Sequence, residues 1–531
     1  MKTMNKYIGI AALSVMALLA GCSDSFLQRD SLTSVSTSTF WQTETDALNG
    51  LAACYDGLQS GFLYNDGNGD KWNGCGPLNM DAMTDNGGHF NWSGWMPGYD
   101  ICNGIHSGSS RLVGEYWKAC YEVIKRCNTL ISNIDRVDMG ADDIALYKAE
   151  AIVIRSLMYT NLTMTYNDVP YLVEVQSLTN AECPKIARET IVRNVMSDLK
   201  SAAAILPKEA VSRGRVTKGA ALSLLGRLAL YNGLWDEAIS AYEQVLNLGY
   251  SLFPDYTALF TEKNEGCDEI IWGIRYEGPA LQEGSCLGGH WDTPLEALNA
   301  TVDLADAFYG LDGKPTEDKV VCGHNEDGSA DLWTLNEARY ANRDPRLRAT
   351  LFIPGMAWAD KDWYYGGAAA SYSTLYVMKY FNPSLNGTTS WDSGQDFYVI
   401  RYAEVLLSLA EAYVEKGDNL NKAIALIDDV RNRAGMPTVE SVEGTGLSQS
   451  AIREVVRHER RVELAFEGLR LFDIYRWKLL KDAVDRINNE AETYNFWYEY
   501  RNYRGEQEYV WPIPQTEIDS NSQLEQHSLW K

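Results

Sequence analysis

Two stretches of the chain repeat one pattern of small and large apolar residues, and this pattern constrains the fold most. The first stretch reads LGRLALYNGLWDEAISAYEQVL and the second reads LAEAYVEKGDNLNKAIALIDDV, with one residue inserted. The repeated positions are Leu225, Gly226, Gly233, Ala238, Tyr242 and Val245 in the first copy and Leu409, Ala410, Tyr413, Gly417, Ala423, Ile427 and Val430 in the second. Small residues let two antiparallel helices approach closely, and large residues fill the groove between them. Each stretch is therefore predicted to be a packed pair of helices.

Two further segments show the apolar spacing of long helices. YWKACYEVIKRCNTLISNI and LYKAEAIVIRSLMYTNLTMTY place apolar residues at steps of three and four, and the second ends where Asn167 and Pro170 interrupt it. Together with the repeats, they predict a mostly α-helical, tetratricopeptide-like scaffold over residues 40–60, 115–272 and 398–490.

Two insertions lack this period. Residues 61–114 and 273–397 are rich in Gly, Asn, Asp and Trp, and we expect them to form long, irregular loops. Loops on a rigid scaffold commonly carry function. These two insertions are therefore the predicted ligand face.

Charge and composition exclude some classes of partner. The chain has 47 basic and 72 acidic residues, a formal net charge of -25, so phosphate backbones are repelled and nucleic acid is not an expected partner. It has 16 Trp and 31 Tyr but only 13 Phe. Trp and Tyr combine an apolar face with a polar edge, which suits partly solvated surfaces.

The N-terminus has the features of a lipoprotein signal. Lys2 and Lys6 precede an apolar run that ends in Leu-Ala-Gly-Cys, with Cys22 at the position that bacterial lipoproteins acylate. Residues 1–21 are thus predicted to be removed, leaving a lipid on Cys22 as the membrane anchor. No later run has the ~18 apolar residues that a membrane-spanning helix needs.

No pattern for a metal, a cofactor or a catalytic group is found. The nine cysteines after Cys22 contain no CxxC pair, the histidines no HExxH motif, and the disulfide pairing stays open. The segment DGNGDK places Asp66, Asn68 and Asp70 at the first three ligand positions of a calcium loop. Lys71 and Pro77 then replace its glycine and its bidentate glutamate, which argues against calcium.

A charged segment near the C-terminus resembles a catalytic helix at first sight. In RHERRVELAFEGLRLFDIYRW, a single helix would place Glu463, Glu467, Arg470 and Asp473 on one face. Carboxylates one turn apart, flanked by Arg460, Arg461, Arg470 and Arg476, are better placed to pair with arginine than to cleave a glycosidic bond. We interpret the segment as a structural ion-pair network.

Several motifs follow one another in the order seen in SusD-like (RagB/SusD) lipoproteins. After Cys22 they are SFLQRD, FWQTETDALNGLAACYDGL, AEAIVIRSLMYTNLTMTYNDVPY, IRYAEVLLSLAEAYVEKGD, VRNRAG, HERRVELAFEGLRLFDIYRW and PIPQTEI. The resemblance runs from the lipobox to the C-terminus; at the tail, Gln526-His527 replaces the usual Gln-Asn. It implies one SusD-like domain over residues 22–531.

The resemblance also implies a function. Members of this family are non-catalytic lipoproteins of the cell outer membrane, facing the exterior, that capture glycans and deliver them to a SusC-like TonB-dependent transporter. Their ligand face is made by loops inserted between the scaffold helices. Neither an enzymatic activity nor a cofactor is implied.

Within the insertions, we expect three rings and three polar residues to contact ligand. Trp92, Trp95 and Trp291 offer flat faces for the C–H faces of sugars, and Asp81, Asp85 and Asn91 offer partners for hydroxyl groups. The alternative is that such rings only fasten long loops to the body.

Two other functions stay open. The same scaffold can capture another nutrient such as peptides, and a glycoside hydrolase is the less favoured alternative. The sequence does not identify the sugar, its linkage or its length.

Overall fold

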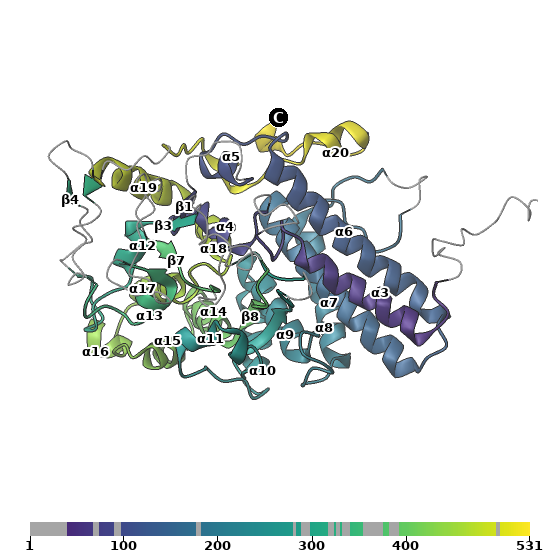
Figure 1. Ribbon diagram of the computed structural model, residues 1–531, viewed down its shortest axis with the longest axis horizontal. Coiled ribbons are helices and arrows are strands. Elements are labelled where there is room, and N and C mark those ends of the chain that lie inside the picture. Colours follow the sequence, from purple (N-terminus) through teal and green to yellow (C-terminus); the bar gives the residue numbers. More distant parts are fainter. Residues whose placement is uncertain are drawn as a thin grey trace, which may run out of the picture.

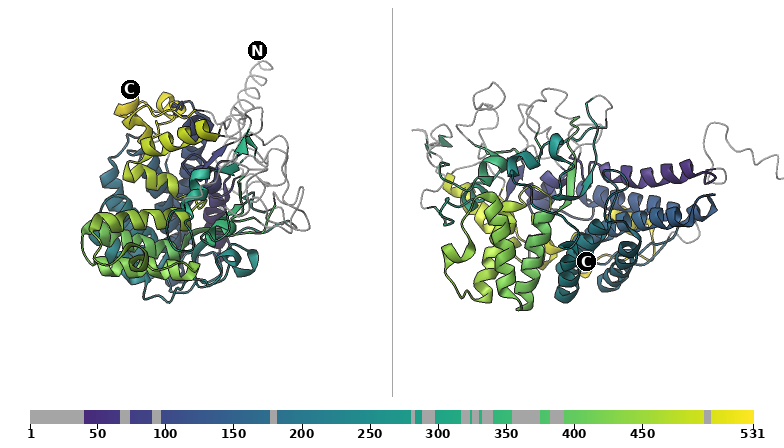
Figure 2. Two further views of the ribbon diagram at one scale, coloured as in Figure 1. Left: turned by 90° about the vertical axis from the view of Figure 1, so that its left-hand side faces the viewer. Right: turned by 90° about the horizontal axis from the view of Figure 1, so that it is seen from below.

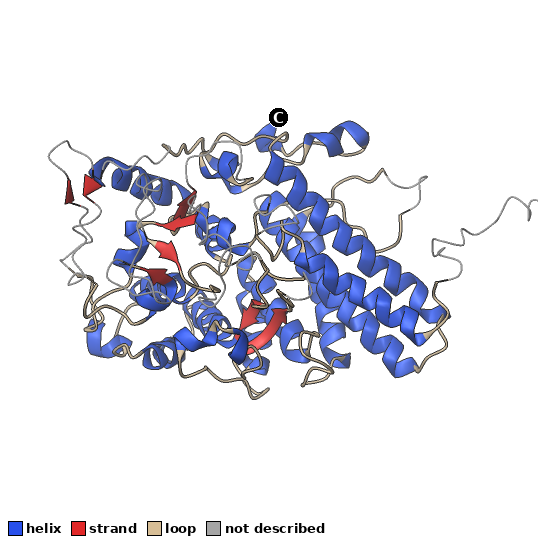
Figure 3. Cartoon of the chain, in the orientation of Figure 1, coloured by secondary structure: helices blue, strands red, loops and turns tan. Residues whose placement is uncertain are grey.

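Antiparallel helices make up most of the protein (Figures 1 and 3). The computed structural model describes residues 40–66, 74–89, 97–176, 182–279, 283–287, 298–316, 323–324, 330–331, 340–353, 375–381, 392–494 and 500–531. The longer helices are α3 (Glu44–Asp56), α6 (Arg111–Asn133), α7 (Ala141–Tyr166), α8 (Arg188–Ile205), α9 (Lys218–Tyr231), α10 (Trp235–Val245), α14 (Tyr402–Lys416), α15 (Leu420–Ala434), α17 (Gln449–Glu463), α18 (Arg470–Trp477) and α19 (Leu480–Tyr494). Shorter helices are α4 (Pro77–Ala82), α5 (Tyr99–Cys102), α11 (Tyr256–Leu259), α12 (Val302–Ala307), α13 (Arg346–Thr350), α16 (Val439–Glu443) and α20 (Gln515–Ser520). None of the described helices is both long and apolar enough to cross a membrane.

The predicted helix pairs are confirmed as α9 with α10 and α14 with α15. An added Cβ at Gly226 would lie 2.6 Å from the Tyr242 ring, so α9 and α10 approach as closely as the sequence pattern requires. Gly233 and Gly417, with φ of 70° and 73°, occupy the turns, where a left-handed conformation favours glycine. The mostly α-helical, tetratricopeptide-like fold is therefore confirmed.

The two long helices predicted from apolar spacing are α6 and α7. They pack side by side with α8 (Figure 1). α7 ends at Tyr166 because Asn167 adopts a φ of 66°. The Tyr166 hydroxyl donates to the Val113 carbonyl at 2.5 Å, which joins the end of α7 to α6.

The segment predicted as one charged helix is two helices. α17 ends at Glu463 and α18 begins at Arg470. Phe466 and Gly468 between them have φ values of 59° and 74°, which no helix continues through. The prediction of a single helix is wrong because the apolar period carries on across a turn.

The insertions are more regular than their composition predicts. A four-stranded antiparallel sheet, in the order β1-β3-β7-β6, consists of β1 (Gly87–His89), β3 (Leu298–Ala300), β7 (Tyr376–Val377) and β6 (Leu351–Phe352). Two other sheets pair β2 (Ile270–Ile274) with β8 (Phe397–Arg401), and β4 (Gly323–His324) with β5 (Ala330–Asp331). Strands of two or three residues are too short to show an alternating pattern in the sequence.

The helices and the small sheets lie on different sides of the molecule. In the right-hand view of Figure 2, the green helices that include α14 and α15 extend away from the teal segments that hold the strands. The scaffold thus presents the insertions on one side and helix ends on the other.

Candidate functional site

The pairing of β1 with β3 brings the two predicted ligand loops to one place. Gly87, Gly88 and His89 lie opposite Ala300, Asn299 and Leu298. The chain leaves His89 into residues 90–96, which contain Asn91, Trp92 and Trp95, and it enters Leu298 from residues 288–297, which contain Trp291. These four of the six predicted ligand residues lie outside the described residues. Their loops nevertheless start from neighbouring positions of one sheet.

A third loop starts from the same sheet. Tyr376 of β7 lies opposite Asn299 of β3, and β6 pairs with β7 on the other side. Residues 354–374, which connect β6 to β7, contain Trp358 and Trp363. The sequence alone did not predict that the strands flanking three aromatic-rich segments pair in one sheet.

Asp85 supports this sheet from inside the protein. Its carboxylate accepts hydrogen bonds from Arg470 Nε and Nη2 at 2.9 and 2.8 Å and is also bonded by Arg486. The side chain is 0% exposed, and Arg461 and Arg470 hold its pKa well below the ordinary value despite burial. We expected Asp85 to bind sugar hydroxyls; this expectation is corrected, because its oxygens are bonded to arginine.

Asp81 is corrected for the same reason. Helix α4 begins at Pro77, whose missing N–H suits a first helical position, and places Asp81 in the core with 0% exposure. Its Oδ2 accepts from the backbone N–H of Phe466 at 2.5 Å and from Asn86 Nδ2 at 3.1 Å. Burial raises its pKa to about 7. Asp81 therefore holds the turn between α17 and α18.

Arg501 also supports the segment that leads into β1, a role that the sequence does not predict. Its guanidinium donates to the backbone carbonyls of Thr84 and Gly87 at 2.7 Å each and to that of Ala82 at 3.3 Å. The residue is 5% exposed and fastens the segment between α4 and β1 to the C-terminal part of the chain. No local sequence signal marks it, because its acceptors are backbone groups more than 400 residues away.

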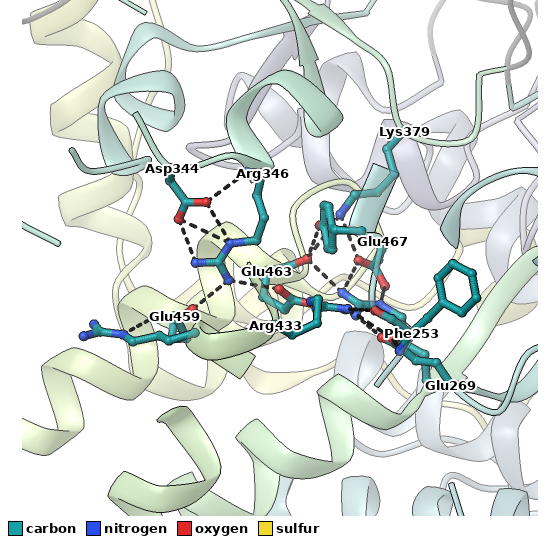
Figure 4. Close-up of polar contacts among 12 residues, drawn as sticks. Phe253, Glu269, Asp344, Arg346, Lys379, Arg433, Glu459, Glu463 and Glu467 are labelled. Atoms are coloured by element: carbon teal, nitrogen blue, oxygen red, sulfur yellow. Dashed lines mark hydrogen bonds and ion pairs between the residues drawn. The ribbon is translucent and has the colours of Figure 1, made fainter. Parts of the chain in front are cut away.

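The predicted ion-pair network exists, although several of its partners are different. Glu463 and Glu467 are bonded to cations from distant segments (Figure 4). Arg401 donates to both residues, and Arg346 donates to Glu463 at 2.9 Å. Lys379 donates to Glu467 at 2.9 Å. Of the arginines within the segment, Arg460, Arg461, Arg470 and Arg476 pair mainly with Asp473, Asp303, Asp85 and Glu411.

These buried carboxylates are ionised. Arg433, Arg401 and Arg346 hold the pKa of Glu463 far below its ordinary value although burial opposes this. Arg401 and Lys379 lower the pKa of Glu467 in the same way. A general acid needs a pKa near the working pH, so neither residue suits that role.

A different carboxyl pair has raised pKa values and lines a cavity of about 400 Å³ between β2 and the α8–α9 connection. Glu265 and Asp396 are hydrogen-bonded to each other, and Arg213 Nη2 lies 3.0 and 3.4 Å from them. Burial raises the pKa of Glu265 to about 8 and that of Asp396 to about 6. Two carboxyl groups in direct contact are closer than the roughly 5–10 Å separation that glycoside hydrolases use.

No cluster that could hold a metal ion is found among the described residues. Asp66, the first residue of the weak calcium pattern, accepts hydrogen bonds from Gly76 N and Asn79 Nδ2 at 2.7 Å each. Asn68 and Asp70 lie outside the described residues. Asp66 thus has a structural role at the start of α4.

Comparisons with known proteins agree with this architecture. A family model described as the SusD family matches residues 268–530, and one described as starch-binding associating with outer membrane matches residues 63–230. SusD-like protein P25 of Formosa agariphila is 25% identical over 94% of each chain.

Solved structures match over nearly the whole chain. The crystal structure of a SusD-like carbohydrate-binding protein from Bacteroides fragilis is 26% identical, covers 92% of this chain and 100% of that chain, and has a TM-score of 0.77. Surface glycan-binding protein A from Bacteroides uniformis is 22% identical with a TM-score of 0.68 over 92% and 100% of the two chains, which shows a shared fold. The matches cover the helical scaffold and the insertions alike, and the chain belongs to the RagB/SusD family.

Proposed function

We propose that this protein captures an extracellular oligosaccharide or polysaccharide on its loop face and delivers it to a SusC-like TonB-dependent transporter, without catalysing a reaction. The observation that carries the proposal is the register of β1 and β3, in which His89 lies opposite Leu298. Loops that contain Trp92, Trp95 and Trp291 begin from these adjacent positions. In this proposal the rings of these loops stack on successive sugars, and Asn91 bonds their hydroxyls.

We further propose that the ligand is largely uncharged. The arginines beneath the sheet are already neutralised, because Arg470 and Arg486 are bonded to Asp85 and Arg461 is bonded to Asp303. The chain as a whole is acidic. A neutral glycan is not repelled by the acidic chain, and it binds without breaking these arginine–carboxylate pairs.

The protein is proposed to reach its ligand from the outer surface of the cell. In this proposal residues 1–21 are removed and Cys22 carries the lipid that anchors the chain to the outer membrane. The 18 residues from Cys22 to Thr39 then precede the first described residue. When extended they span at most about 60 Å, which lets the rest of the 22–531 domain stand clear of the bilayer.

Affinity electrophoresis of the mature chain tests the binding proposal. Migration is compared in gels that contain starch, laminarin, xylan or no glycan, and the same mixtures are assayed for new reducing ends. We expect retardation by at least one glycan without release of sugar. If no glycan retards the protein, glycan capture is contradicted and another nutrient is favoured. If the wild type releases sugar and the Glu265→Gln variant does not, the protein is an enzyme.

Single substitutions test the site. Trp92→Ala, Trp95→Ala and Trp291→Ala should each weaken binding by about tenfold while leaving the unfolding temperature unchanged. Trp235→Ala, at a half-buried ring on the helical side, is the matched control and should bind glycan normally. Normal binding by all three loop variants would place the site elsewhere.

A further inference from the structure

A groove of about 660 Å³ lies on the helical side of the molecule. It is bounded by the start of α8, the turn between α9 and α10, and parts of α14, α17 and α18. α14 begins directly after β8, and Glu415 of the groove lies near the opposite end of that helix. The groove is therefore separate from the loop face.

Two arginines of the groove have no carboxylate partner. Arg188 donates through Nε to Asn232 Oδ1 at 2.8 Å and through Nη2 to Met164 Sδ at 3.1 Å and the Tyr231 carbonyl at 3.4 Å. Arg193 donates to the Glu189 carbonyl and the Thr190 hydroxyl at 3.3 Å. Neither forms an ion pair with a carboxylate of the described residues. The chain has 72 acidic residues against 47 basic ones, so two guanidinium groups without a carboxylate partner in one groove are unexpected. The N-terminus of the 18-residue helix α8 adds to the positive potential there.

A third arginine also has unused donors. The Arg457 guanidinium lies 4.9 Å from the centre of the Trp477 ring, and its Nε has no hydrogen-bond partner among the described residues. Its closest carboxylate oxygens belong to Glu415 and Glu454, at 3.7 and 3.9 Å. By contrast, the neighbouring Arg476 donates twice to Glu411, at 2.5 and 2.7 Å. Arg457 is thus held in place by stacking. Its Nε is buried, but its Nη1 and Nη2 have no carboxylate oxygen closer than 3.7 Å and remain able to bind an anion.

Arginines outnumber carboxylates in the lining of the groove. Arg188, Arg193, Arg457 and Arg476 line it together with Glu189, Glu411 and Glu415. Glu411 is paired with Arg476 and Glu415 with Arg453, whereas Glu189 lies exposed in the first turn of α8. The groove therefore offers an excess of cationic donors, which favours a ligand with carboxylate oxygens.

The remaining wall of the groove is apolar. Leu234 is 38% exposed, Trp235 is half-buried, and Val192 and Leu230 lie beside them. A sugar acid presents hydroxyl groups on most of its surface, and these would lose their water against leucine and valine. A peptide that carries an aliphatic or aromatic side chain next to an acidic one can contact both the apolar wall and the arginines.

We propose that this groove binds an acidic peptide segment of a partner protein. Arg457, Arg188 and Arg193 hold its carboxylates, and Trp235 and Leu234 receive an adjacent apolar side chain. This interaction is additional to glycan capture and does not depend on it.

Fluorescence anisotropy with defined peptides tests the proposal on the mature chain. The probes are labelled, end-capped hexapeptides that place two Asp or Glu residues beside one Leu, Phe or Trp, each with an Asn or Gln counterpart. We expect some acidic probes to bind, with affinity that falls between about 50 and 300 mM salt, and their amide counterparts to bind at least about tenfold more weakly. No acidic probe binding below about 1 mM, or equal binding of the amide counterparts, overturns the proposal.

Matched variants complete the test. Arg457→Gln and Trp235→Ala should each weaken peptide binding by about tenfold and leave glycan binding unchanged. Arg126→Gln, at a partly exposed arginine of α6 that is paired with Asp56 of α3, should change neither peptide binding nor glycan binding. Equal peptide binding by all variants overturns the proposal. Competition by tetragalacturonate as strong as that of the best peptide would also overturn it and make the groove a saccharide site.

Discussion

Arg401 donates from Nη1 to Glu463 Oε1 at 2.6 Å, although 62 residues separate the two in the sequence. Arg401 ends β8 and Glu463 ends α17, so the contact joins the sheet beside the insertions to the helical scaffold. Both residues are at most 1% exposed. The contact stabilises the fold only as part of a fully paired network, because a buried ion pair by itself gains little.

Removing the charge of Glu463 should therefore be strongly destabilising. Glu463→Gln leaves Arg346, Arg401 and Arg433 without their shared anion, and breaking a buried pair in this way costs about 3–5 kcal/mol. Urea denaturation followed by circular dichroism measures the loss. Glu454→Gln, an exposed carboxylate on the same helix with an ion pair at 3.9 Å, is the control and should change stability by less than about 1 kcal/mol. Equal stabilities of the two variants would contradict the role of the network.

Asp85→Asn separates support of the loop face from contact with the ligand. The substitution preserves the shape of the side chain but removes the anion shared by Arg470 and Arg486, so we expect a loss of about 3 kcal/mol in the free energy of unfolding. Below its unfolding temperature the variant should keep its glycan affinity, because the carboxylate is buried. Calorimetric titration at low temperature measures this affinity. A large loss of glycan affinity without a loss of stability would restore Asp85 as a ligand residue.

The sequence predicted the helices well and the long-range contacts poorly. α6, α7 and the two helix pairs have apolar periods that extend over several turns, which is the signal that single sequences carry best. Asp81 and Asp85 were assigned to the ligand because they adjoin a Trp-rich stretch. Asp81 is bonded to Phe466 and Asp85 to Arg470, each 385 residues away, so the local pattern is the same whether such a carboxylate faces a sugar or a distant part of the protein.

The sheet at the candidate site was unpredictable for a related reason. β1, β3, β6 and β7 have two or three residues each, and their partners come from segments far apart in the chain. The locations of the insertions could be predicted because composition changes over tens of residues. Their meeting at one sheet depends on strand pairing, which composition does not encode.

Gly468→Ala should destabilise the turn that Asp81 holds. Gly468 has a φ of 74°, and a Cβ at this position would lie 2.9 Å from Pro77 Cβ at the start of α4. Both the backbone conformation and the contact disfavour alanine, so we expect a loss of about 1–3 kcal/mol, measured by urea denaturation. Gly435→Ala provides the comparison, since Gly435 has a φ of 76° but no atom within 4 Å of an added Cβ. A similar loss in the two variants would show that the Pro77 contact adds nothing.

The Glu265–Asp396 pair should make stability fall with rising pH. The folded pKa of Glu265 is about 8, whereas its ordinary value is 4.5. Between these values the folded protein keeps a proton that the unfolded chain releases, so stability decreases as pH rises through this window and becomes independent of this group above pH 8. The charges of Asp396 and Glu262 also raise the pKa of Glu265, and the charge of Arg213 lowers it, but burial is the largest cause of the shift.

Glu265→Gln tests this expectation, because an amide keeps the shape and cannot ionise. Unfolding temperatures measured from about pH 5 to pH 8.5 should decline less steeply in the variant than in the wild type, and the difference between the two slopes removes the contributions of all other groups. Glu262→Gln, at the neighbouring carboxylate, controls for a general loss of negative charge and should keep the wild-type slope. Parallel curves for Glu265→Gln and the wild type would mean that Glu265 is already ionised in the folded protein and that Arg213 outweighs burial.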